Sequence, residues 1–279
     1  METTSRLGHV VLVILLGILS LSACVSSGPT PKIDEVIPEG RLYAIAEGLR
    51  PGTIVYVHGY MASIASSQPV LRQLEGFGLR VLAFELPGHG QAAGERYTIG
   101  EFSDYGRALN MALTTVVERQ GDLSLGPTYL VAHSLGAVAV LEALRQGLQA
   151  DGLVLIAPLL RIKSPVITTI GVNLLSPFTR VLPGGTRVSW FRAYQRWRRQ
   201  EAQTEVAPWP TTIIIASEKD TVVSNLVMKR FAEEHENTEY QEIPKVNHWE
   251  VDSYDSSSPL WSAIDGALYD FLNQGRLGK

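Results

Sequence analysis

Five short apolar runs, which alternate with segments of helical pattern, constrain the fold of this chain more than any other feature. The runs are nearly continuous in apolar character and lie at 53–57, 79–84, 127–132, 152–157 and 211–216. Such runs are typical of strands buried on both faces, as in parallel sheets covered by helices. The alternation predicts an α/β protein whose mainly parallel sheet has helices on both faces.

The segments around these runs predict the helices and the edges of the sheet. Apolar periodicity indicates helices at 68–74, 102–119, 135–149, 224–235 and 260–273. Two further stretches, 41–46 and 240–243, are expected to add strands at the edges of the sheet.

Composition excludes several classes of function. The chain has 24 Lys and Arg against 28 Asp and Glu, a formal net charge of −4, so it lacks the basic field that sequence-independent nucleic-acid binding requires. A single Cys allows neither an intramolecular disulfide nor a paired-Cys zinc site. Zincin spacing and Gly-rich nucleotide loops are also absent from the sequence, so neither a metal nor a cofactor is expected.

The N-terminal segment is typical of an export signal. An uncharged apolar stretch of twelve residues at 10–21 is shorter than the roughly 20 residues that span a bilayer, and small residues follow it. Residues 1–23 are therefore interpreted as a cleaved signal peptide. The motif LSAC at 21–24 resembles a bacterial lipobox, in which the cysteine, here Cys24, is acylated and becomes the mature N-terminus.

This resemblance implies a cell-envelope protein attached to a membrane through lipid on Cys24. Two acyl chains suffice for stable attachment. The alternative is a core cysteine behind an ordinary signal peptide. Val25 is not the Asp that retains such lipoproteins in the inner membrane, so the outer membrane is favoured if the source is Gram-negative. Residues 24–40 hold few large apolar side chains and are predicted to be a tether, with the folded core beginning at residue 41.

A basic insertion interrupts the alternation of strands and helices. Residues 161–207 contain eight basic and two acidic residues and are predicted to form a cap between the core segments 41–160 and 208–279. Aromatic residues share one face of a helix here, at Trp190, Tyr194 and Trp197. Either this stripe packs on the core and the arginines are solvated, or the arginines at 192, 196 and 199 face an anionic membrane.

The strongest catalytic signal is a strand, a tight turn and an Ala-rich helix around Ser134. The motif matches the nucleophile elbow G-x-S-x-G, except that Ala132 replaces the first glycine. An elbow holds the serine in a strained conformation with its Oγ exposed, and it turns the next amide, that of Leu135, toward a developing oxyanion. Ser134 is therefore the predicted nucleophile.

The expected partners of Ser134 follow it in the order acid, then histidine. Asp220 comes directly after the run at 211–216, and His248 lies in a loop before the last helix. A serine needs a base, and the base needs a carboxylate that fixes its tautomer, so His248 is the predicted base and Asp220 its orienting acid. The amide of Tyr60, which follows the first run, is expected to complete the oxyanion hole with Leu135.

The histidines beside this site receive a structural interpretation. His58 and His133 flank the predicted nucleophile in sequence or strand order. We expect them to be packing and hydrogen-bonding neighbours of the elbow, not bases.

With these motifs the chain resembles the α/β-hydrolase superfamily, and within it the serine hydrolases of the monoacylglycerol lipase and lysophospholipase type, which are serine aminopeptidase-like. The segment 84–96 is similar to the family turn D-x-x-G-H-G-x-S-x-G, with Glu85 in place of Asp and Ala92 in place of Ser. The resemblance covers about 49–273. It implies an α/β-hydrolase fold with an inserted helical cap, an acyl-enzyme mechanism on carboxylic esters, and a lipid-like ester as the favoured substrate.

Other functions remain open at this point. Peptidases and thioesterases use the same triad on the same fold. A non-catalytic lipid-binding or envelope lipoprotein could also retain the fold, although the intact set of Ser134, Asp220 and His248 argues against it. The sequence gives no oligomeric state.

Overall fold

The computed structural model describes residues 33–37, 40–120, 126–163, 181, 186–200, 210–252 and 257–277. The predicted signal peptide, Cys24 and the first part of the predicted tether lie outside these residues. Apart from residues 186–200, most of the predicted cap also lies outside the described residues.

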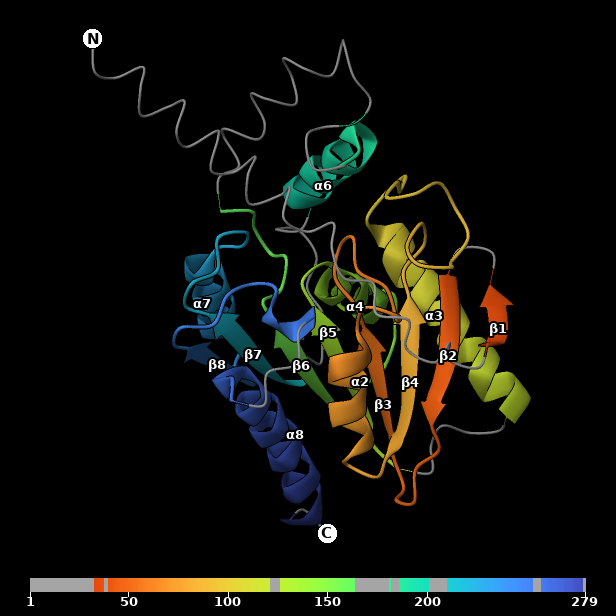
Figure 1. The fold of residues 1–279 in the computed structure, drawn as a ribbon, viewed down its shortest axis with the longest axis vertical. Helices are drawn as coiled ribbons and strands as arrows, with labels where there is room; N and C mark the ends of the chain where they lie inside the picture. Colours follow the sequence, from red (N-terminus) through yellow and green to blue (C-terminus); the bar gives the residue numbers. More distant parts are fainter. Residues whose placement is uncertain are drawn as a thin grey trace.

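An eight-stranded sheet forms the centre of the molecule, in the order β1-β2-β4-β3-β5-β6-β7-β8 (Figure 1). Six strands run parallel: β3 (Thr53–Val57), β4 (Arg80–Glu85), β5 (Thr128–His133), β6 (Gly152–Ile156), β7 (Thr211–Ser217) and β8 (Thr238–Ile243). The two antiparallel strands at one edge are β1 (Ile33–Ile37) and β2 (Gly40–Ala46). All five apolar runs form strands, and the predicted mainly parallel sheet is confirmed.

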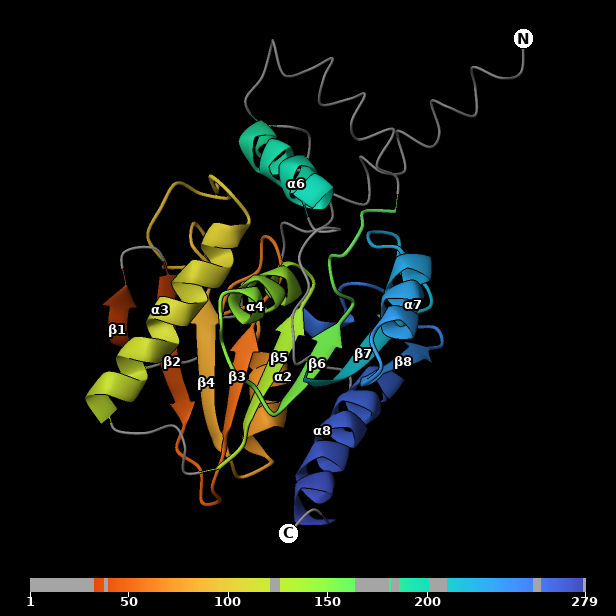
Figure 2. The same cartoon turned by 180° about the vertical axis from the view of Figure 1, so that it is seen from behind.

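Helices cover both faces of the sheet, as predicted. One face carries α2 (Gln68–Glu75) and α8 (Pro259–Leu277), which lie in front of the strands in Figure 1. The other carries α3 (Ser103–Gln120), α4 (Leu135–Arg145) and α7 (Asn225–Glu234), seen from behind in Figure 2. Alternate residues of one strand serve the two cores: Val55 belongs to the cluster with α3 and α4, while Ile54 belongs to the cluster with α2 and α8.

One helix is shorter than predicted. The periodicity predicted a helix over 135–149, but α4 ends at Arg145. Gly147 has a φ of +98°, and its N–H and that of Leu148 donate back to the last turn of the helix. A glycine in this conformation ends the helix at little steric cost, although the apolar pattern continues.

The predicted tether is wrong for its last part, because β1 lies within it. Residues Ile33–Ile37 pair antiparallel with β2, from Ile33 opposite Tyr43 to Ile37 opposite Gly40. The short segment has few apolar residues, but three of its five are Ile or Val, which favour strands. It also pairs with β2, the next strand along the chain, and this pairing outweighs the polar composition.

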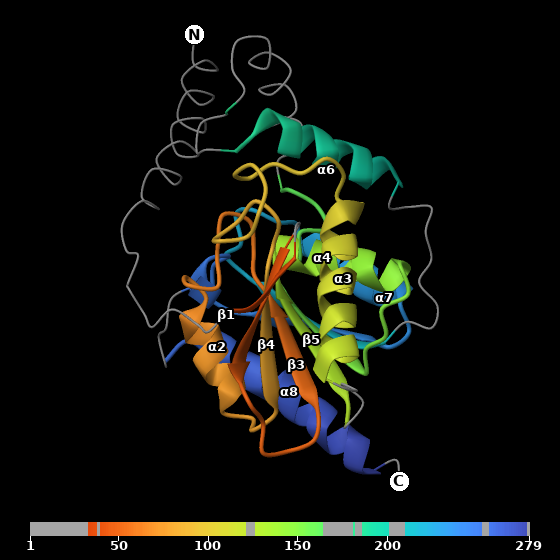
Figure 3. The same cartoon turned by 90° about the vertical axis from the view of Figure 1, so that its right-hand side faces the viewer.

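Within the predicted cap, the structure describes helix α6 (Val188–Gln200), which lies beyond the ends of the parallel strands (Figure 3). The aromatic stripe of α6 is buried, with Trp190, Tyr194 and Trp197 each at most 4% exposed in the same core cluster as α3 and α4. Arg192 and Arg199 lie on the exposed side. The prediction that the stripe packs onto the core is confirmed. In the part of the chain that the structure describes, no helix is long and apolar enough to span a bilayer.

Candidate active site

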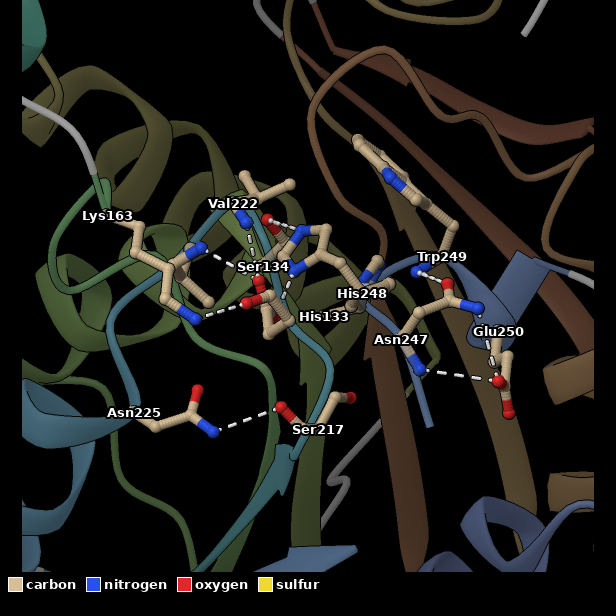
Figure 4. A network of polar contacts seen from close by, with 12 residues as sticks. His133, Ser134, Lys163, Ser217, Val222, Asn225, Asn247, His248, Trp249 and Glu250 are labelled. Atoms are coloured by element: carbon tan, nitrogen blue, oxygen red, sulfur yellow. Dashed lines mark hydrogen bonds and ion pairs between the residues drawn. The ribbon is translucent and has the colours of Figure 1, made fainter. Parts of the chain in front are cut away.

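Three loops at the carboxyl edge of the sheet bring the predicted triad together. Ser134 follows β5, Asp220 follows β7, and His248 follows β8. Their exposed fractions are 5%, 1% and 2%. The close-up in Figure 4 shows the ring of His248 between the nucleophile and the loop that carries the acid. Parallel strands end at a common edge, so residues 114 positions apart meet here.

The backbone at Ser134 is strained, as an elbow requires. Its φ is +51° and its ψ is −112°, a region that residues with a side chain rarely adopt. The conformation is held because Ser134 N–H donates to Ile156 O at 2.9 Å, and Ser134 O accepts from Leu159 N–H at 3.0 Å. Hydrogen bonds to both sides of the residue compensate for the strain and fix the direction of Oγ.

Gly136 allows the helix after the elbow to approach the sheet. A Cβ at this position would lie 2.2 Å from Val57 O and 2.6 Å from His58 O. By contrast, Ala132, which replaces the first glycine of the motif, is fully buried within β5. Only the second glycine of the elbow is sterically obligatory in this chain, and the departure at Ala132 leaves the elbow intact.

The three side chains form a continuous chain of polar contacts. His248 Nε2 lies 3.0 Å from Ser134 Oγ, and His248 Nδ1 lies 2.7 Å from Asp220 Oδ2. A carboxylate accepts only, so Nδ1 carries the proton and Nε2 is left to accept the hydroxyl proton. Asp220 Oδ1 accepts from Val222 N–H at 2.7 Å and Val223 N–H at 2.8 Å, which fixes the carboxylate in its own loop.

The two predicted oxyanion amides flank the nucleophile. Leu135 is the first residue of α4, where the N–H has no acceptor within the helix. Tyr60 follows Gly59, and a Cβ on Gly59 would lie 3.2 Å from the Cβ of Ser134, so this loop passes directly beside the elbow. The role of the two amides in binding an oxyanion stays a prediction.

Comparison with known proteins finds similar sequences among hydrolases. Residues 50–186 match the Hydrolase_4 family, serine aminopeptidase S33. Human monoglyceride lipase is 33% identical over 135 residues, which is 48% of this chain and 44% of the relative, and the mouse protein is 28% identical over 138 residues, or 49% and 45%. The chain thus spans less than half the length of these curated relatives. The family match contains Tyr60 and Ser134 and ends before Asp220 and His248.

Solved structures resemble the chain over most of its length. A soluble variant of monoglyceride lipase from Saccharomyces cerevisiae, solved with a substrate analog, superposes with a TM-score of 0.65 at 14% identity over 91% of this chain and 98% of that one. The monoacylglycerol lipase of Paleococcus ferrophilus gives 0.61 at 20% identity over 83% and 99%. The chain has the α/β-hydrolase fold.

His58 is a hydrogen-bonding neighbour of the elbow, as expected, and the structure adds His89 beside it. His58 Nδ1 donates to Gly59 O at 2.8 Å, and Nε2 accepts from Leu86 N–H at 3.2 Å. Burial lowers the pKa of His58 to about 4. His89 is similar: its Nδ1 donates to Pro87 O, and burial lowers its pKa to about 3. Both rings are therefore uncharged near neutral pH.

His133 has a closer connection to the base than the sequence indicated. Its Nε2 donates to the backbone oxygen of His248 at 3.1 Å, so it links the end of β5 to the loop that carries the base. Burial and the neighbouring His248 hold the pKa of His133 well below its ordinary value. The motif placed His133 beside Ser134, but only the fold shows that it contacts residue 248.

Glu85 connects two loops of the fold through hydrogen bonds, and the sequence did not predict these contacts. Its buried carboxylate accepts from Ile64 N–H at 2.9 Å, Gln91 N–H at 2.7 Å and Tyr43 Oη–H at 3.1 Å. It therefore joins the segment after Tyr60 to the turn that follows β4. The signal in the sequence is a glutamate at the end of an apolar run, which by itself indicates only a departure from the family's aspartate.

The described residues contain no cluster of three or more His, Cys, Asp or Glu that could hold a metal ion.

Proposed function

We propose that this chain is a serine hydrolase that cleaves carboxylic esters through an acyl-enzyme on Ser134. The observation that carries the proposal is the contact chain from Ser134 Oγ through His248 to Asp220, at 3.0 and 2.7 Å. The residues occur in the order expected for an α/β-hydrolase, and the monoglyceride lipases and esterases among similar proteins support the same reaction class.

Each group has a defined task in this mechanism. Ser134 Oγ attacks the ester carbonyl while His248 Nε2 takes the hydroxyl proton, and the Asp220 carboxylate stabilises the imidazolium. The amides of Tyr60 and Leu135 stabilise the oxyanion. His248 then donates its proton to the departing alcohol. Water, deprotonated by the same base, attacks the acyl-enzyme, and collapse of the second intermediate releases the acid and restores Ser134.

A lipid-like ester, of the monoacylglycerol or lysophospholipid type, is the substrate class we favour. Two large apolar side chains are exposed directly beside the catalytic groups: Met61, which follows Tyr60, is 43% exposed, and Trp249, which follows His248, is 37% exposed. The Trp249 ring packs edge-on against His248 at 4.8 Å between centroids. Such side chains provide apolar contact for an acyl chain next to the nucleophile.

The proposal is tested with chromogenic esters of short and long acyl chains, with and without a serine-reactive phosphonate. We expect turnover by the wild type, its loss after one equivalent of phosphonate, and neither turnover nor labelling in Ser134→Ala. Matched thioester and amide substrates separate the thioesterase and peptidase alternatives by relative kcat/KM. A wild type that binds lipid but shows no turnover and no labelling would instead support a non-catalytic lipid-binding protein.

We also propose that the protein is exported and attached to the cell envelope through lipid on Cys24, with the outer membrane favoured in a Gram-negative source. The apolar stretch at 10–21 and the motif at 21–24 support this. Cys24→Ser should leave an unprocessed precursor that incorporates no fatty-acid analogue, whereas Ser27→Ala, a matched change in the tether, should be processed normally. Equal labelling of wild type and Cys24→Ser would refute the anchor.

A further inference from the structure

The loop that carries Asp220 is covered by the first residues of the basic insertion. We call residues 220–224 the acid loop and residues 161–163 the clamp segment. The two segments run antiparallel, with a β-bridge between Ile162 and Val223. Figure 4 shows Lys163 of the clamp segment extending toward the acid loop beside Val222.

Three hydrogen bonds join the clamp segment to the acid loop. Lys163 N–H donates to Val222 O at 2.8 Å, and Ser224 N–H donates to Arg161 O at 2.9 Å. The Lys163 ammonium donates to the backbone oxygen of Asp220 at 2.6 Å. The clamp segment therefore holds the loop near both of its ends, and Lys163 contacts the backbone of the residue that bears the catalytic carboxylate.

The clamp segment is in turn held by the cap helix. Ile162 N–H donates to Tyr194 Oη at 3.0 Å. Tyr194 lies in α6, is 3% exposed, and stacks on Trp190 with ring centroids 6.0 Å apart. Its phenolic oxygen is fixed by the buried aromatic stripe. Contacts are thus continuous from α6 through the clamp segment to Asp220.

The position of the acid loop matters because the carboxylate moves with it. Both hydrogen bonds to Asp220 Oδ1 come from residues 222 and 223 of the same loop. A shift of the loop would therefore lengthen the 2.7 Å contact between Asp220 Oδ2 and His248 Nδ1. Misplacement of a catalytic group by about 1 Å can reduce a rate by about a hundredfold.

We propose that Lys163 and Tyr194 are positioning residues for Asp220, through which the docked cap helix sets the catalytic acid. This inference rests on the proposed function, because it requires a working triad. Neither residue is assigned contact with the substrate. Their effect is exerted through the acid loop, and it should vanish when the acid is absent.

The test measures kcat and KM for a soluble short-chain ester and the rate of phosphonate labelling of Ser134. Lys163→Met keeps the apolar stem and removes the ammonium, and Tyr194→Phe removes one oxygen. We expect each to lower kcat and the labelling rate about tenfold, the change produced by about 1.4 kcal/mol, with KM within about twofold. Lys163→Arg should restore most of the loss. The matched controls, on exposed residues of α7 and α8, are Lys229→Met and Tyr269→Phe.

The decisive measurement repeats these changes in an Asp220→Ala background. If Lys163 and Tyr194 act through Asp220, neither substitution slows labelling further there. An equal loss in both backgrounds, or no loss in the wild-type background, overturns the inference. Inactive wild-type protein would instead mean that the proposed function has failed. If Lys163→Met does not fold, the single-atom change Tyr194→Phe decides the question alone.

Discussion

Two regions meet at the active site and are held in place by different interactions. The elbow is fixed by main-chain hydrogen bonds at the end of β5, and the acid loop after β7 by main-chain N–H groups that donate to the Asp220 carboxylate and by bonds to the clamp segment. Helix α6 is held by side chains: its aromatic stripe, the bond from Trp197 Nε1 to Glu142 Oε1 at 2.8 Å, and the ion pair between Arg196 and Glu101 at 2.9 Å. Ser134 is thus placed by main-chain contacts at the end of its strand, whereas the cap and its link to the acid loop depend on a few side chains.

This difference predicts that substitutions in the triad cause large losses of activity, whereas substitutions in the cap cause smaller effects. His248→Ala should show the largest effect, because it removes the proton acceptor for Ser134 Oγ, and loss of a triad member costs about 10⁴- to 10⁶-fold in turnover. Steady-state hydrolysis of a chromogenic ester measures it. His235→Ala, at the end of α7, is the control and should retain activity. The assignment fails if His248→Ala stays active while His133→Ala or His58→Ala is inactive.

A second prediction concerns the backbone of the elbow. Gly136→Ala places a Cβ 2.2 Å from Val57 O, so β3 and α4 must separate, and we expect a loss of about 3 kcal/mol or more in the free energy of unfolding. Gly266→Ala in α8, where a Cβ meets nothing within 4 Å, should stabilise by up to about 1 kcal/mol. Denaturant unfolding measures both. Equal effects would mean that α4 approaches the sheet less closely than described.

The third prediction addresses the attachment of the cap. Glu142→Gln removes the charge that accepts from Trp197 and pairs with Arg145, both largely buried, so the free energy of unfolding should fall by about 1.5 to 3 kcal/mol. Arg196→Gln breaks an exposed pair and should cost at most about 1 kcal/mol. The same denaturant titration compares the two. A larger loss for Arg196→Gln would show that the exposed contacts dominate cap attachment.

The fourth prediction follows from the neutral histidines of the core. His58 has a folded-state pKa of about 4, below its ordinary value of 6.5, so the unfolded chain binds more protons in this window. Stability is complete above pH 6.5 and falls toward pH 4, by up to about 1.4 kcal/mol per pH unit for this residue. His58→Asn should reduce the slope of unfolding free energy against pH. Residues 161–207 contain no His, so the cap adds nothing of this kind. An unchanged slope would contradict the neutral, buried state of His58.

The smallest expected effect concerns the exposed side of α6, where we propose contact with an anionic membrane. Arg192 and Arg199 lie on the exposed side of this helix and are the residues to test. Changing both to Gln should weaken binding of residues 25–279 to anionic vesicles by up to about 1 kcal/mol per arginine, with the difference lost in high salt. Lys229 and Arg230 of α7, changed together to Gln, are the charge-matched control. If both pairs act equally, net charge and not the cap surface governs binding.

Much of this molecule follows from local patterns in the sequence. The apolar runs predicted five of the six parallel strands, β3 to β7, because strands buried on both faces need continuous apolar residues. The order of Ser134, Asp220 and His248 along the chain predicted that their side chains lie together in the folded protein, since parallel strands end at one edge. Both predictions depend on short segments whose own residues form the recognisable pattern.

Other features depend on pairing between distant segments and were not predictable. The contact of His133 with the backbone of His248 spans 115 positions, and the ammonium of Lys163 reaches Asp220 across 57. Propensity and periodicity describe neighbours in sequence. Contacts between residues this far apart in the chain can therefore be identified only in the folded structure.

The strand β1 also limits how far a lipid anchor would let the enzyme move. It begins at Ile33, so an anchor at Cys24 is separated from the folded domain by only nine Cα–Cα steps. A fully extended chain of this length reaches at most about 32 Å, roughly the thickness of the hydrocarbon layer itself. The domain would remain within about one bilayer thickness of the lipid surface. Its search for substrate then becomes nearly two-dimensional, and esters carried by its own membrane would be met far more often than those in solution.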